Sequence, residues 1–237
     1  MSVITRRILP ATAIAAASVL VATGCAAGEN ADAAPADASS EWSASTVTVD
    51  WATYNPLSLV IKDQGLLDEI LGDSVTVEWV QSAGSNKANE LLRSGSVDVG
   101  STAGSAALLA RANGSPIKVI DIYSQPEWSA IVVGPDSDID SLEDLAGTSV
   151  AATKGTDPYF FLLQALEEGG LSVDDVEVQN LQHADGRAAL DGGSVDAWAG
   201  LDPIMGAAEV ESGDKLIYRN VDFNTYGFLN ATEDFIE

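Results

Sequence analysis

The chain has 237 residues, of which 36 are Asp or Glu and 11 are Lys or Arg, so its formal net charge is −25. This acidic excess argues against nucleic acids and anionic lipid surfaces as partners, because both are bound through clustered cations. Hydrophobic residues make up 46% of the chain, which opposes disorder and allows a real core. The single cysteine excludes a disulfide framework and a cysteine-based zinc site.

Residues 1–25 predict an export signal. Arg6-Arg7 precedes an apolar run over 8–23 that is too short for a stable membrane span, and Cys25 follows shortly after it. The pattern resembles a bacterial lipoprotein signal, in which Cys25 is lipidated and becomes the new N-terminus. An ordinary signal peptide with an incidental cysteine is the alternative. Residues 26–45, rich in Ala, Asp, Ser and Pro, are typical of a flexible tether.

From residue 46 onward, one pattern of strands and helices occurs twice at a spacing of about 100 residues. In the first copy we expect a strand over Thr46–Trp51, a helix opened by Pro56, a strand over Val75–Val80 and a helix over Asn86–Ser94. In the second we expect a strand over Thr148–Ala152, a helix opened by Pro158, a strand over Val176–Leu181 and a helix over Ala184–Leu190. Each copy closes with the sequence Gly-Ser-Val-Asp, at 95–98 and at 193–196.

Local chemistry supports these elements. Proline at the first helical position loses no hydrogen bond, and glycine after the last turn accepts the left-handed conformation that ends a helix. Because strands alternate with helices, we expect parallel sheets with right-handed crossovers, and hence an α/β fold with two lobes. Segments between and after the copies predict two crossings between the lobes, which form a hinge and an interlobe cleft able to close on a ligand. The expected lobe boundaries are 46–125 for lobe 1, 126–221 for lobe 2, and 222–237 for a return crossing to lobe 1.

Several short segments, in this order and at this spacing, resemble one family, the substrate-binding proteins of ABC importers for aliphatic sulfonates, taurine, nitrate and thiamine precursors. They are Tyr54–Val60, Gly95–Thr102, Leu142–Gly147, Lys154–Thr156, Gly193–Trp198 and Asp202-Pro203. The resemblance covers residues 46 to about 232. It implies a type II periplasmic-binding-protein fold, no catalysis, no cofactor and no metal, with an ABC permease and ATPase as partners. It also implies an extracytoplasmic location, lipid-anchored to the cell membrane or periplasmic.

The sequence departs from the family in two places. Leu201 stands where the family usually has an aromatic residue before the Asp-Pro pair. Family members also continue through further helices packed on the first lobe, so these C-terminal helices are expected to be missing from a sequence that stops at Glu237.

Candidate ligand-binding residues come from loops expected at the carboxyl ends of the strands, where ligands bind to doubly wound sheets. Small hydroxyl residues and glycines at helix starts leave backbone N–H groups free to bind an anion such as a sulfonate. As the alternative, the hydroxyl residues are ordinary helix N-caps. The candidates are Tyr54, Asn55, Ser82, Ser101, Thr102, Trp128, Lys154, Gly155, Thr156 and Asp202.

Other residues are assigned by type and position. Tyr54, Trp128 and Tyr159 could hold an apolar or cationic part of a ligand, whereas Trp51, Trp79 and Trp198 lie on expected strands and are assigned to the core. Asp202 could accept a hydrogen bond from a ligand amine or cap the helix that follows. His183 is the only histidine, so no histidine-based triad or metal cluster can form, and we expect it to be solvated at a helix start.

From these observations we expect an extracytoplasmic receptor of an ABC importer that binds a small organic sulfonate-like solute. The same fold binding a thiamine precursor, nitrate or an amine-containing solute is one alternative. A tethered sensory or binding lipoprotein without a transport role is another. An enzyme on this fold is disfavoured, because the related iron-dependent chemistry needs a cysteine-rich motif that the sequence lacks.

Overall fold

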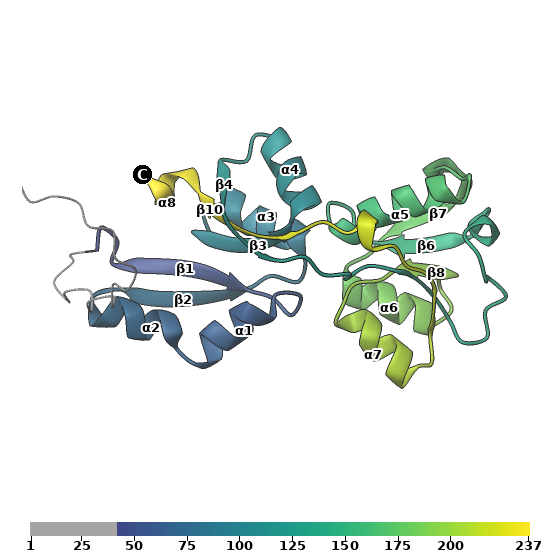
Figure 1. Cartoon of the computed structure of the whole chain (residues 1–237), viewed down its shortest axis with the longest axis horizontal. Helices are drawn as coiled ribbons and strands as arrows, with labels where there is room; N and C mark the ends of the chain where they lie inside the picture. Colours follow the sequence, from purple (N-terminus) through teal and green to yellow (C-terminus); the bar gives the residue numbers. More distant parts are fainter. Residues whose placement is uncertain (1–41) are drawn as a thin grey trace, which may run out of the picture. The chain divides into compact units, whose positions relative to one another are not determined.

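The computed structural model describes residues 42–237, so the expected signal sequence, Cys25 and most of the tether lie outside the described residues. Two five-stranded sheets form the described part of the chain (Figure 1). The first sheet contains β1 (Thr46–Trp51), β2 (Thr76–Gln81), β3 (Val99–Ala103), β4 (Ile117–Ser124) and β10 (Gly227–Thr232). The second contains β5 (Ile131–Val133), β6 (Ser149–Ala152), β7 (Glu177–Asn180), β8 (Ala197–Ala199) and β9 (Lys215–Tyr218).

Helices connect the strands within each lobe. The first lobe holds α1 (Pro56–Asp63), α2 (Leu66–Leu71), α3 (Ser85–Arg93), α4 (Gly104–Ala112) and, at the end, α8 (Glu233–Ile236). The second lobe holds α5 (Asp157–Glu168), α6 (His183–Asp191) and α7 (Ile204–Glu211). Short 3-10 turns lie at Gly72–Ser74, Glu143–Leu145, Val173–Asp175 and Val221–Phe223. Among these described elements, no helix combines the length and apolar character needed to cross a membrane.

The expected repeat is confirmed by the strand order, which is β2-β1-β3-β10-β4 in the first sheet and β7-β6-β8-β5-β9 in the second. In both sheets the first three strands in this order are parallel. The expectation of parallel sheets is met by these strands but not by β10 and β5, each of which runs antiparallel to both of its neighbours. Each of these two strands follows a crossing from the other lobe and therefore enters its sheet from the opposite direction.

Helices cover both faces of each sheet. In β2, Trp79 packs with the cluster beneath α2, whereas the next residue, Val80, packs with the cluster beneath α3 and α4. In β6, Val150 belongs to the core beneath α5, and Ala151 belongs to the cluster beneath α6 and α7. Successive side chains of a strand point to opposite faces, so each sheet has two helical layers.

The repeated Gly-Ser-Val-Asp segments have the same structural role in both lobes. Gly95 and Gly193 take φ angles of +66° and +65° directly after a helix, where glycine is favoured. The carboxylate of Asp98 accepts from Thr48 N at 2.7 Å, and that of Asp196 accepts from Ser149 N at 2.8 Å. In each lobe the aspartate therefore fixes the first parallel strand to the loop that precedes the third.

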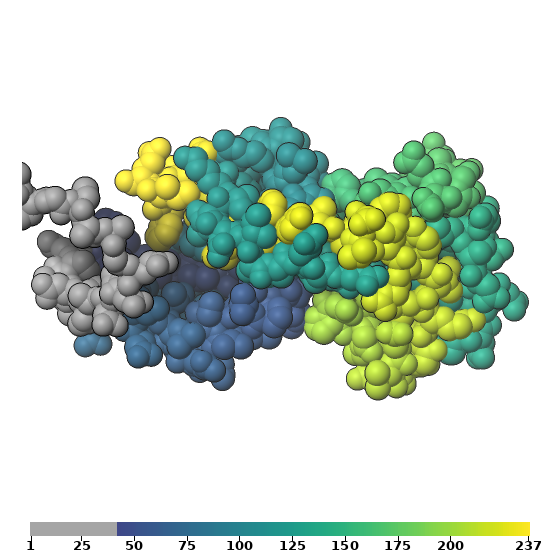
Figure 2. Space-filling view, in the orientation of Figure 1, coloured from purple at the N-terminus to yellow at the C-terminus, as the bar shows by residue number. Residues whose placement is uncertain are grey.

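The two crossings between the lobes lie beside each other (Figure 2). Asn224 on the second crossing is buried, and its Oδ1 accepts from the backbone N–H groups of Trp128 and Ser129 on the first, at 3.2 and 2.9 Å. The side-chain nitrogen of Asn224 donates to Asn220 O at 2.9 Å. One amide thus ties the two crossings together.

Candidate functional site

Three candidate residues of the first lobe meet at a buried carboxylate, that of Asp50. Ser82 Oγ donates to Asp50 Oδ2 at 2.6 Å, and Ser101 reaches Asp50 Oδ1 through its backbone N–H at 2.9 Å and its hydroxyl at 3.0 Å. Tyr54 donates its hydroxyl proton to Ser101 O at 2.8 Å, and that hydroxyl lies 3.2 Å from Ser82 Oγ. The ends of β1, β2 and β3 are therefore joined by one polar network.

The Asp50 carboxyl is buried at the end of β1, and no salt bridge of the described residues includes it. Burial raises its pKa to about 6, although the hydrogen bonds from Ser82 and Ser101 oppose this shift. Burial also raises the pKa of the Tyr54 hydroxyl well above its ordinary value, and the nearby Asp50 carboxylate adds to the effect. Tyr54 is therefore a neutral hydroxyl at every physiological pH.

We expected Ser101 and Thr102 to lie at the start of a helix, but both lie within β3 and are fully buried. The helix starts only at Gly104, after the strand has paired with β10. Thr102 Oγ1 accepts from Asn230 Nδ2 at 2.9 Å. The N-cap alternative is thus wrong for Ser101 and Thr102. Asn55, for which no cap was expected, is the N-cap of α1, and its Oδ1 accepts from Ser58 N at 3.4 Å.

On the second lobe, the loop from Lys154 to Thr156 precedes α5. Thr156 is the buried N-cap residue, but its hydroxyl donates to Thr153 O at 2.6 Å and makes no side-chain cap. Gly155 has a φ of +81°, which favours glycine. The Lys154 side chain is exposed, and its ammonium lies 5.8 Å from the centre of the Tyr159 ring, a cation–π distance.

Asp157 connects both lobes and both crossings. Its Oδ1 accepts from Ser105 Oγ on α4 and from Thr225 Oγ1. Its Oδ2 accepts from Trp128 Nε1 at 2.6 Å and from Thr225 N at 2.8 Å. Four donors converge on one buried carboxylate at the first turn of α5, where the helix dipole also stabilises negative charge. Asp157 therefore fixes the hinge region.

Trp128 is buried where the first crossing enters the second lobe. Its ring meets that of Tyr54 edge to face, with centroids 6.5 Å apart and planes at 86°. Its carbonyl oxygen accepts from Asp202 N at 3.0 Å. Asp202 Oδ1 accepts from Gly206 N at 3.0 Å, as a helix-capping carboxylate does, which supports the capping alternative for this residue.

The lobes also meet at His183, Gly84, Asn86 and Gly155, which we call the interlobe contact. A Cβ atom placed on Gly84 would lie 3.1 Å from His183 Nε2 and 2.9 Å from Asn86 Oδ1. A Cβ on Gly155 would lie 3.7 Å from that of Asn86. Loops of both lobes therefore touch here, and two glycines allow the approach.

We expected His183 to be solvated, but its side chain is buried, with 1% of the residue exposed. Its Nδ1 lies 3.2 Å from Thr153 Oγ1, and its Nε2 has no hydrogen-bond partner among the described residues. Burial lowers its pKa to about 4, so the ring is neutral at pH 7. The sequence shows only a polar residue at a helix start, and solvation is the usual state of such a residue.

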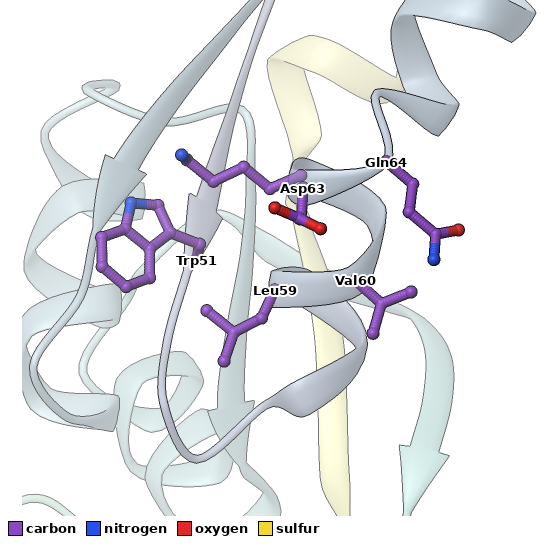
Figure 3. Close-up of a pocket in the computed structure, with 6 residues that line it drawn as sticks. Trp51, Leu59, Val60, Asp63 and Gln64 are labelled. Carbon is purple, nitrogen blue, oxygen red and sulfur yellow. The ribbon is translucent and has the colours of Figure 1, made fainter.

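Trp51 also departs from expectation, since it is only partly buried at the end of β1. It lines a surface pocket of about 430 Å³ with residues of α1 (Figure 3). The Lys62 ammonium lies 5.6 Å from the centre of the indole. Trp198, by contrast, is fully buried as expected, and Trp79 packs against the core from a partly buried position.

Sequence reasoning missed Asp50, His183 and Asp157 as members of the site. Asp50 lies near the carboxyl end of the expected strand, where ligands bind to doubly wound sheets, and this position is a usable signal. Asp157 is the residue before the proline that opens α5, and the sequence pattern places it only in a loop. Its four donors come from segments up to 68 residues away, so no local pattern reveals them.

Comparison with known proteins agrees with this architecture. A family model described as NMT1/THI5 like matches residues 73–236. A protein of Escherichia coli K12 whose name assigns it to aliphatic sulfonates binding is 33% identical over 181 residues, covering 76% of this chain and 56% of that protein. A protein of Bacillus subtilis 168 with the same name is 28% identical over 189 residues, covering 78% and 57%. The chain therefore spans a little over half the length of these relatives.

Solved structures give the same result. The alkanesulfonate-binding protein SsuA of Xanthomonas axonopodis pv. citri, bound to MOPS, matches with a TM-score of 0.75 and 25% identity, over 81% of this chain and 66% of that one. The periplasmic aliphatic sulphonate binding protein SsuA of Escherichia coli matches with a TM-score of 0.69 and 29% identity, over 81% and 67%. These matches establish the two-lobed type II fold of periplasmic binding proteins. Because the family model also covers more than half of the sequence, the chain belongs to the NMT1/THI5-like family.

Proposed function

We propose that this chain is the solute-binding receptor of an ABC importer, and that it binds a small organic sulfonate-like solute between its two lobes. The observation that carries the proposal is the 33% identity over 181 residues to a protein named for aliphatic sulfonates binding. A receptor of this kind binds and releases its solute without catalysis.

The chemistry of the loops supports an anionic group on the ligand. Gly84 and Thr156 occupy the N-cap positions of α3 and α5 without a side-chain cap, so backbone N–H groups of both helices are available. A helix N-terminus stabilises an anion by roughly 0.3–1 kcal/mol, and by up to about 2 kcal/mol when partly buried. Lys154 is the candidate residue that could add a formal charge. The net charge of −25 opposes an anion at long range, but screening over about 8 Å limits this effect.

The remaining candidate residues are proposed to act in two ways. Tyr54, Ser82 and Ser101 hold the strand ends of the first lobe around Asp50, so their main role is to position the loops. Trp128 joins the aromatic contact with Tyr54 to the hinge at Asp157. Ligand-dependent closure would therefore be transmitted to the crossings through these side chains.

Export and anchoring form part of the same proposal. Residues 1–25 would direct export, Cys25 would carry the lipid, and residues 26–45 would tether the lobes near the permease. The similar SsuA of Escherichia coli is a periplasmic protein, which agrees with a location outside the cytoplasm. A Cys25→Ala protein that still partitions with membranes would refute lipid anchoring.

A thermal-shift screen tests the receptor function. The purified protein is heated with alkanesulfonates, taurine, nitrate, thiamine precursors and amines, each at several concentrations. A solute at 100 times its Kd should add about 2.7 kcal/mol to the free energy of unfolding and raise the melting temperature. If no sulfonate raises the melting temperature but a thiamine precursor does, the sulfonate part of the proposal fails. If no solute does, the receptor function fails.

A further inference from the structure

The interlobe contact contains a histidine whose protonation can be deduced from its neighbours. Thr153 Oγ1 lies 2.7 Å from Leu181 O and 3.2 Å from His183 Nδ1. A hydroxyl has one proton, and the carbonyl of Leu181 can only accept, so the Thr153 proton is directed to that carbonyl. Thr153 Oγ1 must then accept from Nδ1–H. In the neutral ring this leaves His183 Nε2 without a proton, as an acceptor.

This acceptor has no donor within the described residues. Nε2 is buried and unpaired, and the same holds for Asn86 Oδ1 from the first lobe. A Cβ atom on Gly84 would lie 3.1 Å from His183 Nε2 and 2.9 Å from Asn86 Oδ1. These two acceptors are therefore at most 6.0 Å apart. Leaving a buried acceptor unpaired is unfavourable, and a ligand that brings a donor would remove this cost.

The surrounding helix ends decide which donor fits. His183 is the first residue of α6, and Gly84 is the N-cap of α3, so the positive ends of two helix dipoles lie at this contact. An ammonium group would be repelled there, whereas a neutral hydroxyl would not. A sulfonate carries no proton at neutral pH, so it cannot donate to Nε2 itself. The donor must belong to another part of the solute.

We propose that His183 Nε2 accepts a hydrogen bond from a hydroxyl group of the solute, so the preferred ligand is a small hydroxylated sulfonate. This inference rests on the proposed function for the anionic group and on the interlobe contact for the hydroxyl. The hydroxyl has one proton, which goes to Nε2, so Asn86 Oδ1 would accept from a water beside it.

The single histidine makes a direct test possible. The protein, purified without a histidine tag and labelled with ¹⁵N-histidine, gives imidazole signals only from His183. In the free protein we expect a protonated-type Nδ1 signal and an unprotonated-type Nε2 signal at neutral pH. The probes are 2-hydroxyethanesulfonate and propane-1-sulfonate, which differ only by a hydroxyl in place of a methyl group. The first should shift the Nε2 signal toward protonated-type values, and the second should not.

Calorimetric titration of the same two probes separates this inference from the proposed function. We expect 2-hydroxyethanesulfonate to bind about tenfold more tightly, as one recovered hydrogen bond allows. His183→Phe should reduce the ratio of the two affinities to about one, whatever it does to each affinity alone. Equal affinities with an unmoved Nε2 signal would overturn the hydroxyl inference and leave the receptor function standing. Binding of neither probe, while the screen finds another ligand class, would overturn the sulfonate proposal, and the hydroxyl inference with it. Protonation of Nε2 from solvent when propane-1-sulfonate binds would show an imidazolium donor and also overturn the inference.

Discussion

The two lobes have the same strand order but bury their side chains to different degrees. In the second lobe, the core beneath α5 is closed, with Phe161, Leu162 and Leu166 fully buried. In the first lobe, the edge strand β4 exposes most of its apolar side chains, including Ile120 and Ile122. The comparison shows that strand order and burial are separate properties. Strand order follows from the repeated crossing pattern, whereas burial depends on what packs against each surface.

An apolar pocket in the first lobe shows this difference in packing. A pocket of about 330 Å³ opens on the first sheet between β4 and the helices α1 and α2, and its lining includes Val49, Trp79 and Ile120 together with the carboxyl-bearing Asp50. The hydroxyl of Tyr123, also in its lining, is buried without a partner among the described residues. The first lobe is thus the less completely packed half, although the same topology builds both.

The largest expected effect concerns equivalent helix positions. Leu162 and Val60 each lie four residues after the proline that opens α5 or α1, and they are 0% and 45% exposed. Leu162→Ala should lower the free energy of unfolding by about 2–5 kcal/mol, because it leaves a cavity in a closed core. Val60→Ala should change it by no more than about 0.5 kcal/mol, as at most surface sites. Chemical denaturation measures both, and equal losses would contradict the difference between the lobes.

The second prediction concerns pH, because the lobes contain buried groups with opposite dependence. Burial raises the pKa of Asp50 from 3.8 to about 6, so its contribution to stability is present at low pH and is lost as pH rises through 4 to 6. Burial lowers the pKa of His183 from 6.5 to about 4, so its contribution is present at neutral pH and is lost as pH falls. Each effect amounts to about 3 kcal/mol, so the two nearly cancel in the wild type.

Single variants should separate these effects. Asp50→Asn should make the protein less stable at pH 4.5 than at pH 7.5, because Asp50 then no longer opposes the histidine dependence. His183→Gln should reverse that order. Denaturation midpoints at the two pH values measure both differences, and variants with the same pH profile as the wild type would show that burial does not control these groups.

The third prediction concerns a substitution that weakens the connection between the lobes. Asp157→Asn replaces an acceptor of four hydrogen bonds by an amide whose N–H groups face other donors, and it should cost about 2–3 kcal/mol. It should also increase the radius of gyration in small-angle scattering, because Ser105 no longer holds the lobes together. Asp174→Asn, at an exposed position in the same lobe, is the matched control. An unchanged radius would show that Asp157 does not restrain the hinge.

The smallest effect tests the repeat itself. Asp98→Ala and Asp196→Ala each remove a carboxylate that fixes the first strand of a sheet, and each should cost about 1 kcal/mol. Hydrogen bonds from the Ser149 backbone and side chain lower the pKa of Asp196, so its contribution should fade as pH drops below the ordinary range of a carboxyl. If only one of the two variants loses stability, the two Gly-Ser-Val-Asp segments are not equivalent.

Local sequence signals were sufficient for most of the elements. The expected strand over Thr46–Trp51 and the helices opened by Pro56 and near Pro158 agree with the structure, because alternation, proline and glycine act on their own neighbourhood. The buried state of His183 and the four partners of Asp157 were not predictable in this way. Both depend on residues from the other lobe or crossing, which meet only after folding. The direction of β5 and β10 was missed for the same reason.

If a small sulfonate-like solute binds between the two lobes, hydrogen exchange with mass spectrometry should detect its effect on both lobes at once. The purified protein is compared with and without 2-hydroxyethanesulfonate at a concentration that saturates binding. We expect binding to slow exchange both in residues 82–86 of the first lobe and in residues 153–156 of the second. Protection confined to one lobe, or to the pocket beside Trp51, would contradict this expectation.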